Sequence, residues 1–152
     1  MTITIYCDGG VHNKRLAIVD LSANGRIIVW ENVNARFGTS NELEELALLK
    51  AIEYVYNEYG TDAENVTIYG DAVSSDLYRT LKASSDKPSF KRLVQLQKKR
   101  LRLLSRFRNH IEGKWIPRKK NLAGQVLEMM YNMDVRLKYR GAKKTIWQIM
   151  NC

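Results

Sequence analysis

Alternation of apolar and polar residues predicts three short strands near the start of the chain. Residues 2–7 alternate with a period of two, and β-rich runs follow at residues 15–21 and 26–33. The second and third runs are joined by Ser22–Gly25, whose Asn-Gly pair is a strong hairpin signal. We therefore expect an antiparallel meander whose first strand ends at Asp8, before Gly9 and Gly10.

The pattern then changes to the spacing of a helix. Apolar residues recur at helical intervals up to Tyr59, Thr39–Asn41 supply capping side chains, and Gly60 ends the pattern. Further elements are predicted as a strand at 65–69, helices at 72–82 and 88–109, a strand at 110–116 and a helix at 121–138. The order βββαβααβα indicates an α/β fold with a five-stranded mixed sheet flanked by helices. Residues 1–138 would form the domain and residues 139–152 a C-terminal tail.

Charge divides the chain into two unlike parts. Of its 152 residues, positions 1–78 carry 5 basic and 12 acidic side chains, whereas positions 79–152 carry 20 basic and 4 acidic ones. An excess of this size indicates a polyanionic partner, although a merely soluble basic surface is the alternative. The sequence contains no long apolar stretch or leader, so we expect no membrane contact. Two cysteines without zinc-ligand spacing favour a cytoplasmic protein.

Three carboxylates stand at the ends of predicted elements. Asp8 and Asp71 follow the first and fourth strands, and Glu44 lies in the first turn of the first long helix. If these strands are neighbours, the three side chains meet at one sheet edge and suit Mg²⁺, which prefers hard oxygen ligands. Each acid also has a structural alternative: a turn at Asp8-Gly9, a capping box from Asn41 to Glu44, and a helix cap at Asp71.

The ordered motifs resemble the ribonuclease H family, type 1-like. They are IYCDGG ending at Gly10, then TSNELEELA from Thr39, and VTIYGDA containing Asp71, and the resemblance covers roughly residues 1–137. It implies a ribonuclease H-like fold in which Asp8, Glu44 and Asp71 are catalytic carboxylates that bind Mg²⁺ or Mn²⁺. It also implies that Asn41 and the backbone of Gly9 and Gly10 contact the nucleic acid beside the scissile phosphate.

One position departs from the family pattern. In the segment from Trp115 to Glu128, Asn121 and Gly124 match, but the family's last catalytic aspartate is replaced by Gln125. A neutral amide binds a divalent cation more weakly than a carboxylate does. Glu128 follows three residues later on the same helix face and is either a substitute ligand or a solvated residue. The loop before this helix is short and lacks the histidine found in many family members.

Basic residues are concentrated in the second half of the chain. The predicted phosphate-binding residues are Lys91, Lys98, Lys99, Arg102 and Arg106 on the long helix and Arg118, Lys119 and Lys120 in the turn after the fifth strand. Such a surface holds phosphates without reading bases. The three tryptophans, including Trp115, are expected in the core or at its edge, with base stacking open only to one in an exposed groove.

The leading hypothesis is a monomeric, metal-dependent endonuclease that cuts the RNA strand of RNA–DNA hybrids. A second hypothesis keeps the fold but changes the substrate to branched or duplex DNA, as in a Holliday-junction resolvase, for which a dimer would be needed. A third is a nucleic-acid-binding protein whose catalysis has been weakened through Gln125. Each of the three requires a nucleic acid as partner.

Overall fold

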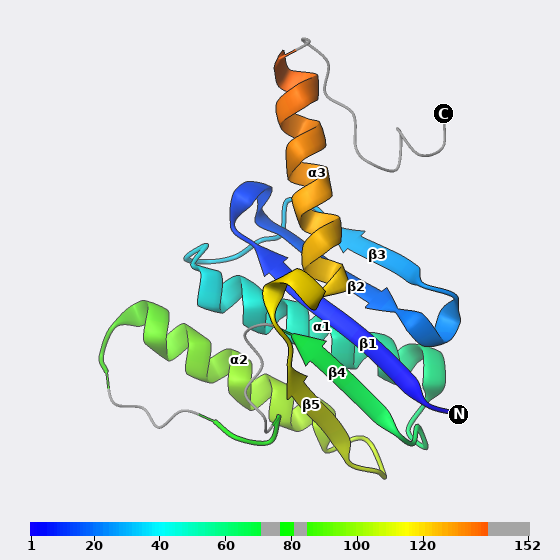
Figure 1. Ribbon diagram of the computed structural model, residues 1–152. Helices are drawn as coiled ribbons and strands as arrows, with labels where there is room; N and C mark the ends of the chain where they lie inside the picture. The colour runs from blue at the N-terminus through cyan, green and yellow to red at the C-terminus, as the bar shows by residue number, and fades with distance from the viewer. Residues whose placement is uncertain (71–76, 81–84, 140–152) are drawn as a thin grey trace.

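The protein folds around one five-stranded sheet. In a computed structural model, residues 1–70, 77–80 and 85–139 are described, and the sheet has the order β3-β2-β1-β4-β5 (Figure 1). The strands are β1 (Ile3–Gly10), β2 (Arg15–Asp20), β3 (Arg26–Trp30), β4 (Val66–Gly70) and β5 (Ile111–Trp115). The helices are α1 (Ser40–Tyr59), α2 (Pro88–Leu104) and α3 (Leu122–Tyr139). This architecture confirms the predicted mixed sheet and its flanking helices.

The register of the sheet brings three strand ends to one edge. β2 runs antiparallel to β1 and to β3, whereas β4 runs parallel to both β1 and β5. Tyr6 lies opposite Tyr69, and Gly70 lies opposite Trp115. The carboxyl ends of β1, β4 and β5 therefore share one edge, where ligands commonly bind in sheets with parallel strands.

Two hydrophobic clusters cover the two faces of the sheet. On one face, α1 and α2 bury the main core, which includes Ile5, Ile68, Leu43 and Leu104. On the other face, α3 packs Val126 and Met130 against residues of β2 and β1, and then continues past the sheet (Figure 1). This arrangement leaves α3 beginning beside the edge at which β1 and β4 end.

The first strand is longer than its alternating pattern predicts. β1 continues through Asp8 to Gly10 because β2 pairs with it along this length, with Asp8 opposite Ala17 and Gly10 opposite Arg15. Its pairing with β4 stops earlier, at Tyr6 and Tyr69. The prediction that Asp8 ends the strand is therefore wrong. Asp8 lies in the part of β1 that pairs with β2 but no longer with β4.

Two predicted helices are corrected by the structure. The helix predicted at 88–109 ends at Leu104, since Phe107 turns inward to pack edge-on against Tyr56 at a ring distance of 5.7 Å. Within the predicted helix at 72–82, residues 77–80 are not helical: Leu77 and Tyr78 form a turn, and the Leu77 carbonyl accepts a hydrogen bond from Arg100. The other positions of that prediction, 72–76 and 81–82, lie outside the described residues. At the C-terminal end, α3 reaches Tyr139, one residue beyond the predicted domain limit.

The helices in the described part of the chain are not suited to crossing a lipid bilayer, because none combines sufficient length with sufficient apolar character.

Candidate active site

β1 and α1 touch through their backbones at Gly9. A Cβ atom placed on Gly9 would lie 2.3 Å from the carbonyl oxygen of Leu43 and 2.9 Å from the amide nitrogen of Glu44. Only glycine permits this approach, because the opposing atoms are backbone and cannot rotate away. The contact therefore holds the backbone of Glu44 beside the residue that follows Asp8.

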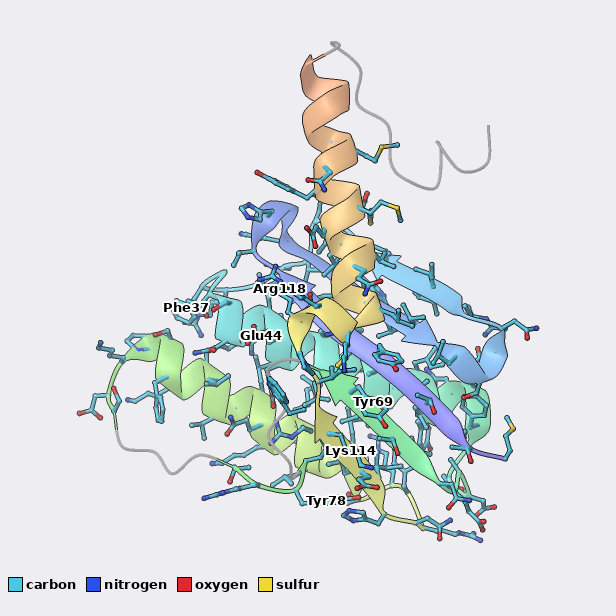
Figure 2. All side chains as sticks on the ribbon, in the orientation of Figure 1. Phe37, Glu44, Tyr69, Tyr78, Lys114 and Arg118 are labelled. Atoms are coloured by element: carbon cyan, nitrogen blue, oxygen red, sulfur yellow. The ribbon has the colours of Figure 1, made fainter. Side chains whose placement is uncertain are left out.

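Asp8 points to the opposite face, toward the start of α3. Its side chain is buried, and its Oδ2 lies 3.2 Å from where a Cβ on Gly124 would stand. The absence of a side chain at Gly124 thus leaves room for this carboxylate. Figure 2 shows Glu44 on the first turns of α1 and Arg118 in the turn before α3, at the sheet end toward which β1 and β4 run.

Gly9→Ala is expected to destabilise the fold by about 1–3 kcal/mol, the usual range for overpacking, and to reduce activity, because α1 must move away from β1. Gly10→Ala is the matched control: a Cβ there would lie 3.5 Å from a methyl group of Leu127, an ordinary contact. Urea unfolding of both variants measures the difference. Equal stability of the two variants would contradict the close approach at Gly9.

The N-terminus of α1 is capped by Thr39 and Glu42, not by the capping box from Asn41 to Glu44 that was the structural alternative for Glu44. The Oγ1 atom of Thr39 accepts a hydrogen bond from the amide of Glu42, and the Glu42 carboxylate accepts bonds from the amides of Phe37 and Gly38. Burial alone would raise the pKa of Glu42, but the two amides and the nearby Arg92 outweigh it and hold that pKa below its ordinary value. The capping acid is therefore Glu42, and the alternative capping role for Glu44 is wrong.

Asn121 joins the start of α3 to β1. It is fully buried, its Nδ2 donates to the carbonyl of Cys7 at 3.0 Å, and its Oδ1 accepts from the amide of Ala123 at 3.1 Å. This side chain sets the position of Gly124 over Asp8. Asn121 was noted in the sequence only as a motif position, and its positioning role becomes visible from these contacts.

Gln125 and Glu128 lie on the exposed side of α3. The Gln125 amide group donates to the carbonyl of Lys119 at 2.7 Å. Both side chains line one shallow hollow, together with Met129, Asn132 and Met133. They share a helix face, as predicted.

The donor chemistry of the site suits a hard divalent cation, but the described residues do not complete a ligand set. Asp8 and Glu44 supply carboxylate oxygens of the kind that Mg²⁺ and Mn²⁺ prefer. Asp71 follows Gly70 directly in the sequence and lies outside the described residues. Among the residues that are described, no three His, Cys, Asp or Glu side chains are grouped to hold a metal ion, so Glu128 does not form such a group with Asp8 and Glu44. A three-carboxylate site thus depends on Asp71.

The residues predicted to contact nucleic acid are exposed or half-buried. Asn41 is exposed in the first turn of α1, and Gly9 and Gly10 are half-buried. All eight predicted basic residues are exposed: Lys91, Lys98, Lys99, Arg102, Arg106, Arg118, Lys119 and Lys120. Arg106 lies beyond the end of α2, so it is not part of the helical stripe, and its guanidinium stands over the Tyr56 ring at 5.8 Å.

Arg100 is a structural residue of this region that the sequence analysis missed. It is 4% exposed, forms an ion pair with Glu45 of α1, and donates to the carbonyls of Leu77 and Arg79. Burial raises the pKa of Glu45, while Arg100 opposes that rise. The available signal was the spacing of Arg100, which is three residues after Gln97 and four before Leu104 on the buried face of α2.

Comparisons with known proteins find similarity in structure alone, since no protein-family profile and no curated protein sequence matches the chain. RNase H1 from the halophilic archaeon Halobacterium salinarum NRC-1 superposes with a TM-score of 0.57 and 22% identity, over 84% of this chain and 94% of that one. The N-terminal RNase H domain of a Mycobacterium tuberculosis protein, solved as a fusion with maltose-binding protein, gives 0.58 and 20% over the same shares. LC11-RNase H1 in complex with an RNA/DNA hybrid gives 0.54 and 21%, over 80% and 89%.

The chain has a ribonuclease H-like fold. The similarity extends over nearly the full length of those neighbours.

Proposed function

We propose that this protein is an endonuclease that hydrolyses the RNA strand of RNA–DNA hybrids, using Mg²⁺ or Mn²⁺ held by Asp8, Glu44 and Asp71. The observation that carries the proposal is the backbone contact of Gly9 with Leu43 and Glu44, which holds the backbone of Glu44 beside the residue that follows Asp8. The ribonuclease H-like fold and the neighbour solved with a hybrid support the choice of substrate.

The register of the sheet supports the inclusion of Asp71. Tyr6 of β1 lies opposite Tyr69 of the parallel strand β4, and their rings stack at 5.2 Å. Asp8 and Asp71 each come two residues after these paired tyrosines in the sequence. Because the two aspartates have the same spacing from a paired position in parallel strands, we expect them to follow the strands at the same end of the sheet.

A bound divalent cation would supply an activated water and stabilise the negative charge that develops at phosphorus. The protein residues have separate tasks. Asp8 and Glu44 would present ligand oxygens, and Asn41 with the backbone of Gly9 and Gly10 would contact the strand beside the scissile bond, where 2′-hydroxyl groups distinguish RNA from DNA. The exposed basic residues would hold phosphates without reading sequence. Hydrolysis by water needs no covalent enzyme intermediate.

A nucleic-acid-binding protein without catalysis is the second candidate, and Gln125 is the observation that favours it. Its neutral side chain donates to the Lys119 carbonyl. By the sequence resemblance, Gln125 would occupy the position of the family's last catalytic aspartate. If Glu128 substitutes as a ligand, catalysis survives this change. If it does not, fewer cations are held and cleavage is slower.

Cleavage of three labelled substrates tests the proposal. Wild type and Asp71→Asn are incubated with an RNA–DNA hybrid, a DNA duplex and a four-way DNA junction, in Mg²⁺ or Mn²⁺. We expect cutting of the hybrid alone, in its RNA strand, and its loss in the variant. Cutting of the junction would instead identify a resolvase, and tight binding without any cutting would identify a binding protein.

A further inference from the structure

Trp115 ends β5 with its side chain 61% exposed. Ile111 and Gly113, on the same face of the strand by alternation, are both buried, so the exposure begins only at the strand end. One exposed hydrophobic residue is ordinary on a protein surface and needs no function by itself. The surroundings of Trp115 are what distinguish it.

Trp115 lies next to the candidate active site. It is opposite Gly70, and the amide of the following residue, Ile116, donates to the Gly70 carbonyl at 3.2 Å. Gly70 is the residue directly before Asp71 in the sequence. The indole is therefore carried by a strand end that is bonded to the last residue of β4.

Exposed cations stand on both sides of Trp115 in the sequence. Lys114 precedes it, and Arg118, Lys119 and Lys120 follow in a turn closed by hydrogen bonds from the Lys120 amide to the Pro117 carbonyl and from the Asn121 amide to the Arg118 carbonyl. Figure 2 shows Lys114 beside β5 and Arg118 in the turn between β5 and α3. Within the described residues, the three cations of the turn make no ion pair with an acidic side chain, so their charge is available to a phosphate backbone.

We propose that Trp115 and this basic turn form a stacking site for an unpaired base in a single-stranded extension beside the bound duplex. An exposed indole with phosphate-binding cations is the combination that single-strand binding uses, and such stacking is sequence-tolerant. Bases inside a duplex have both faces covered by their neighbours, so the site would take only an unpaired base. The preferred substrate is then a hybrid with an overhang or a junction to a single strand. The location of the duplex rests on the proposed function, but the stacking itself does not.

Binding without cleavage tests the stacking site. Fluorescence anisotropy in EDTA compares a blunt RNA–DNA hybrid with the same hybrid extended by a short single strand at each end. We expect wild type to bind the extended hybrid about tenfold more tightly, within the range of stacking on one base. Trp115→Ala should lose this preference while binding the blunt hybrid as before, and Trp115→Phe should keep part of it.

Lys98→Ala is the matched control, because Lys98 is an exposed cation of α2 outside the proposed stacking site, and loss of its phosphate contact should weaken binding to both substrates equally. Wild type without a preference, or Trp115→Ala with an undiminished one, would overturn the inference. The assay stays informative if the hybrid is never cut: a preference that depends on Trp115 would then remain while the proposed nuclease activity fails. If the hybrid is cut but its blunt and extended forms bind with equal affinity, the proposed nuclease activity holds and the stacking site is contradicted.

Discussion

Asp8→Asn is expected to abolish cleavage of an RNA–DNA hybrid, lowering kcat by about a thousandfold, which corresponds to ~4 kcal/mol of transition-state stabilisation. The carboxylate is buried with its Oδ2 against the space left by Gly124, so an amide of nearly the same size fits the site. The substitution removes the charge that a divalent cation needs and leaves the packing in place. Steady-state cleavage of a labelled hybrid in Mg²⁺ measures the effect.

Asp62→Asn is the matched control, because Asp62 is an exposed aspartate paired with Arg108 away from the strand end. It should cut the hybrid at the wild-type rate. Asp8→Asn should also bind the hybrid at least as tightly as wild type, since it removes a negative charge near a phosphate. If Asp8→Asn retains more than about a tenth of the activity, a barrier change below ~1.4 kcal/mol, Asp8 is not a catalytic carboxylate.

Arg100→Met is expected to lower the free energy of unfolding by about 3–5 kcal/mol, the usual cost of removing one partner of a buried ion pair. The change leaves the buried Glu45 without its cation and removes donors from the carbonyls of Leu77 and Arg79. Because the whole domain is stabilised by only about 5–15 kcal/mol, this is a large share of the total. Urea denaturation followed by circular dichroism gives the value.

Lys99→Met controls for the loss of one positive charge from α2, since Lys99 is the exposed neighbour of Arg100. Its stability should stay within about 0.5 kcal/mol of wild type. Adding Glu45→Leu to Arg100→Met should recover part of the loss, because no unpaired charge is then buried. If Arg100→Met lowers the free energy of unfolding by less than about 1 kcal/mol, the ion pair does not stabilise the packing of α2 against α1.

The main elements of the fold were predictable because they rest on local patterns. Alternation predicted the first strand and β-rich runs predicted the second and third, and Asn24-Gly25 correctly joined β2 to β3, where both residues adopt positive φ angles. The end of α2 was not predictable in this way, because Phe107 continues the helical spacing yet packs against Tyr56 of another helix. The extension of β1 through two glycines likewise depends on a partner strand.

The candidate site was predictable in its residues but not in its geometry. The order of Asp8, Glu44 and Asp71 resembles a known pattern. The close approach of Gly9 to the backbone of Leu43 and Glu44 depends on how α1 packs against β1, which the sequence does not show. The capping acid was identifiable, since Thr39 and Glu42 have the spacing of a capping box. The burial of Arg100 was not predictable, because a basic residue on a basic helix is usually solvated.

Calorimetric titration with Mn²⁺ tests most directly whether these carboxylates form a cation site. Wild type and Asp62→Asn are expected to bind Mn²⁺ saturably, and Asp8→Asn is expected to lose that binding while remaining folded. Added hybrid should strengthen the binding, because Mn²⁺ and Mg²⁺ share phosphate oxygens in such sites. Equal Mn²⁺ binding by wild type and Asp8→Asn, or no binding by wild type even with hybrid, would contradict the proposed centre.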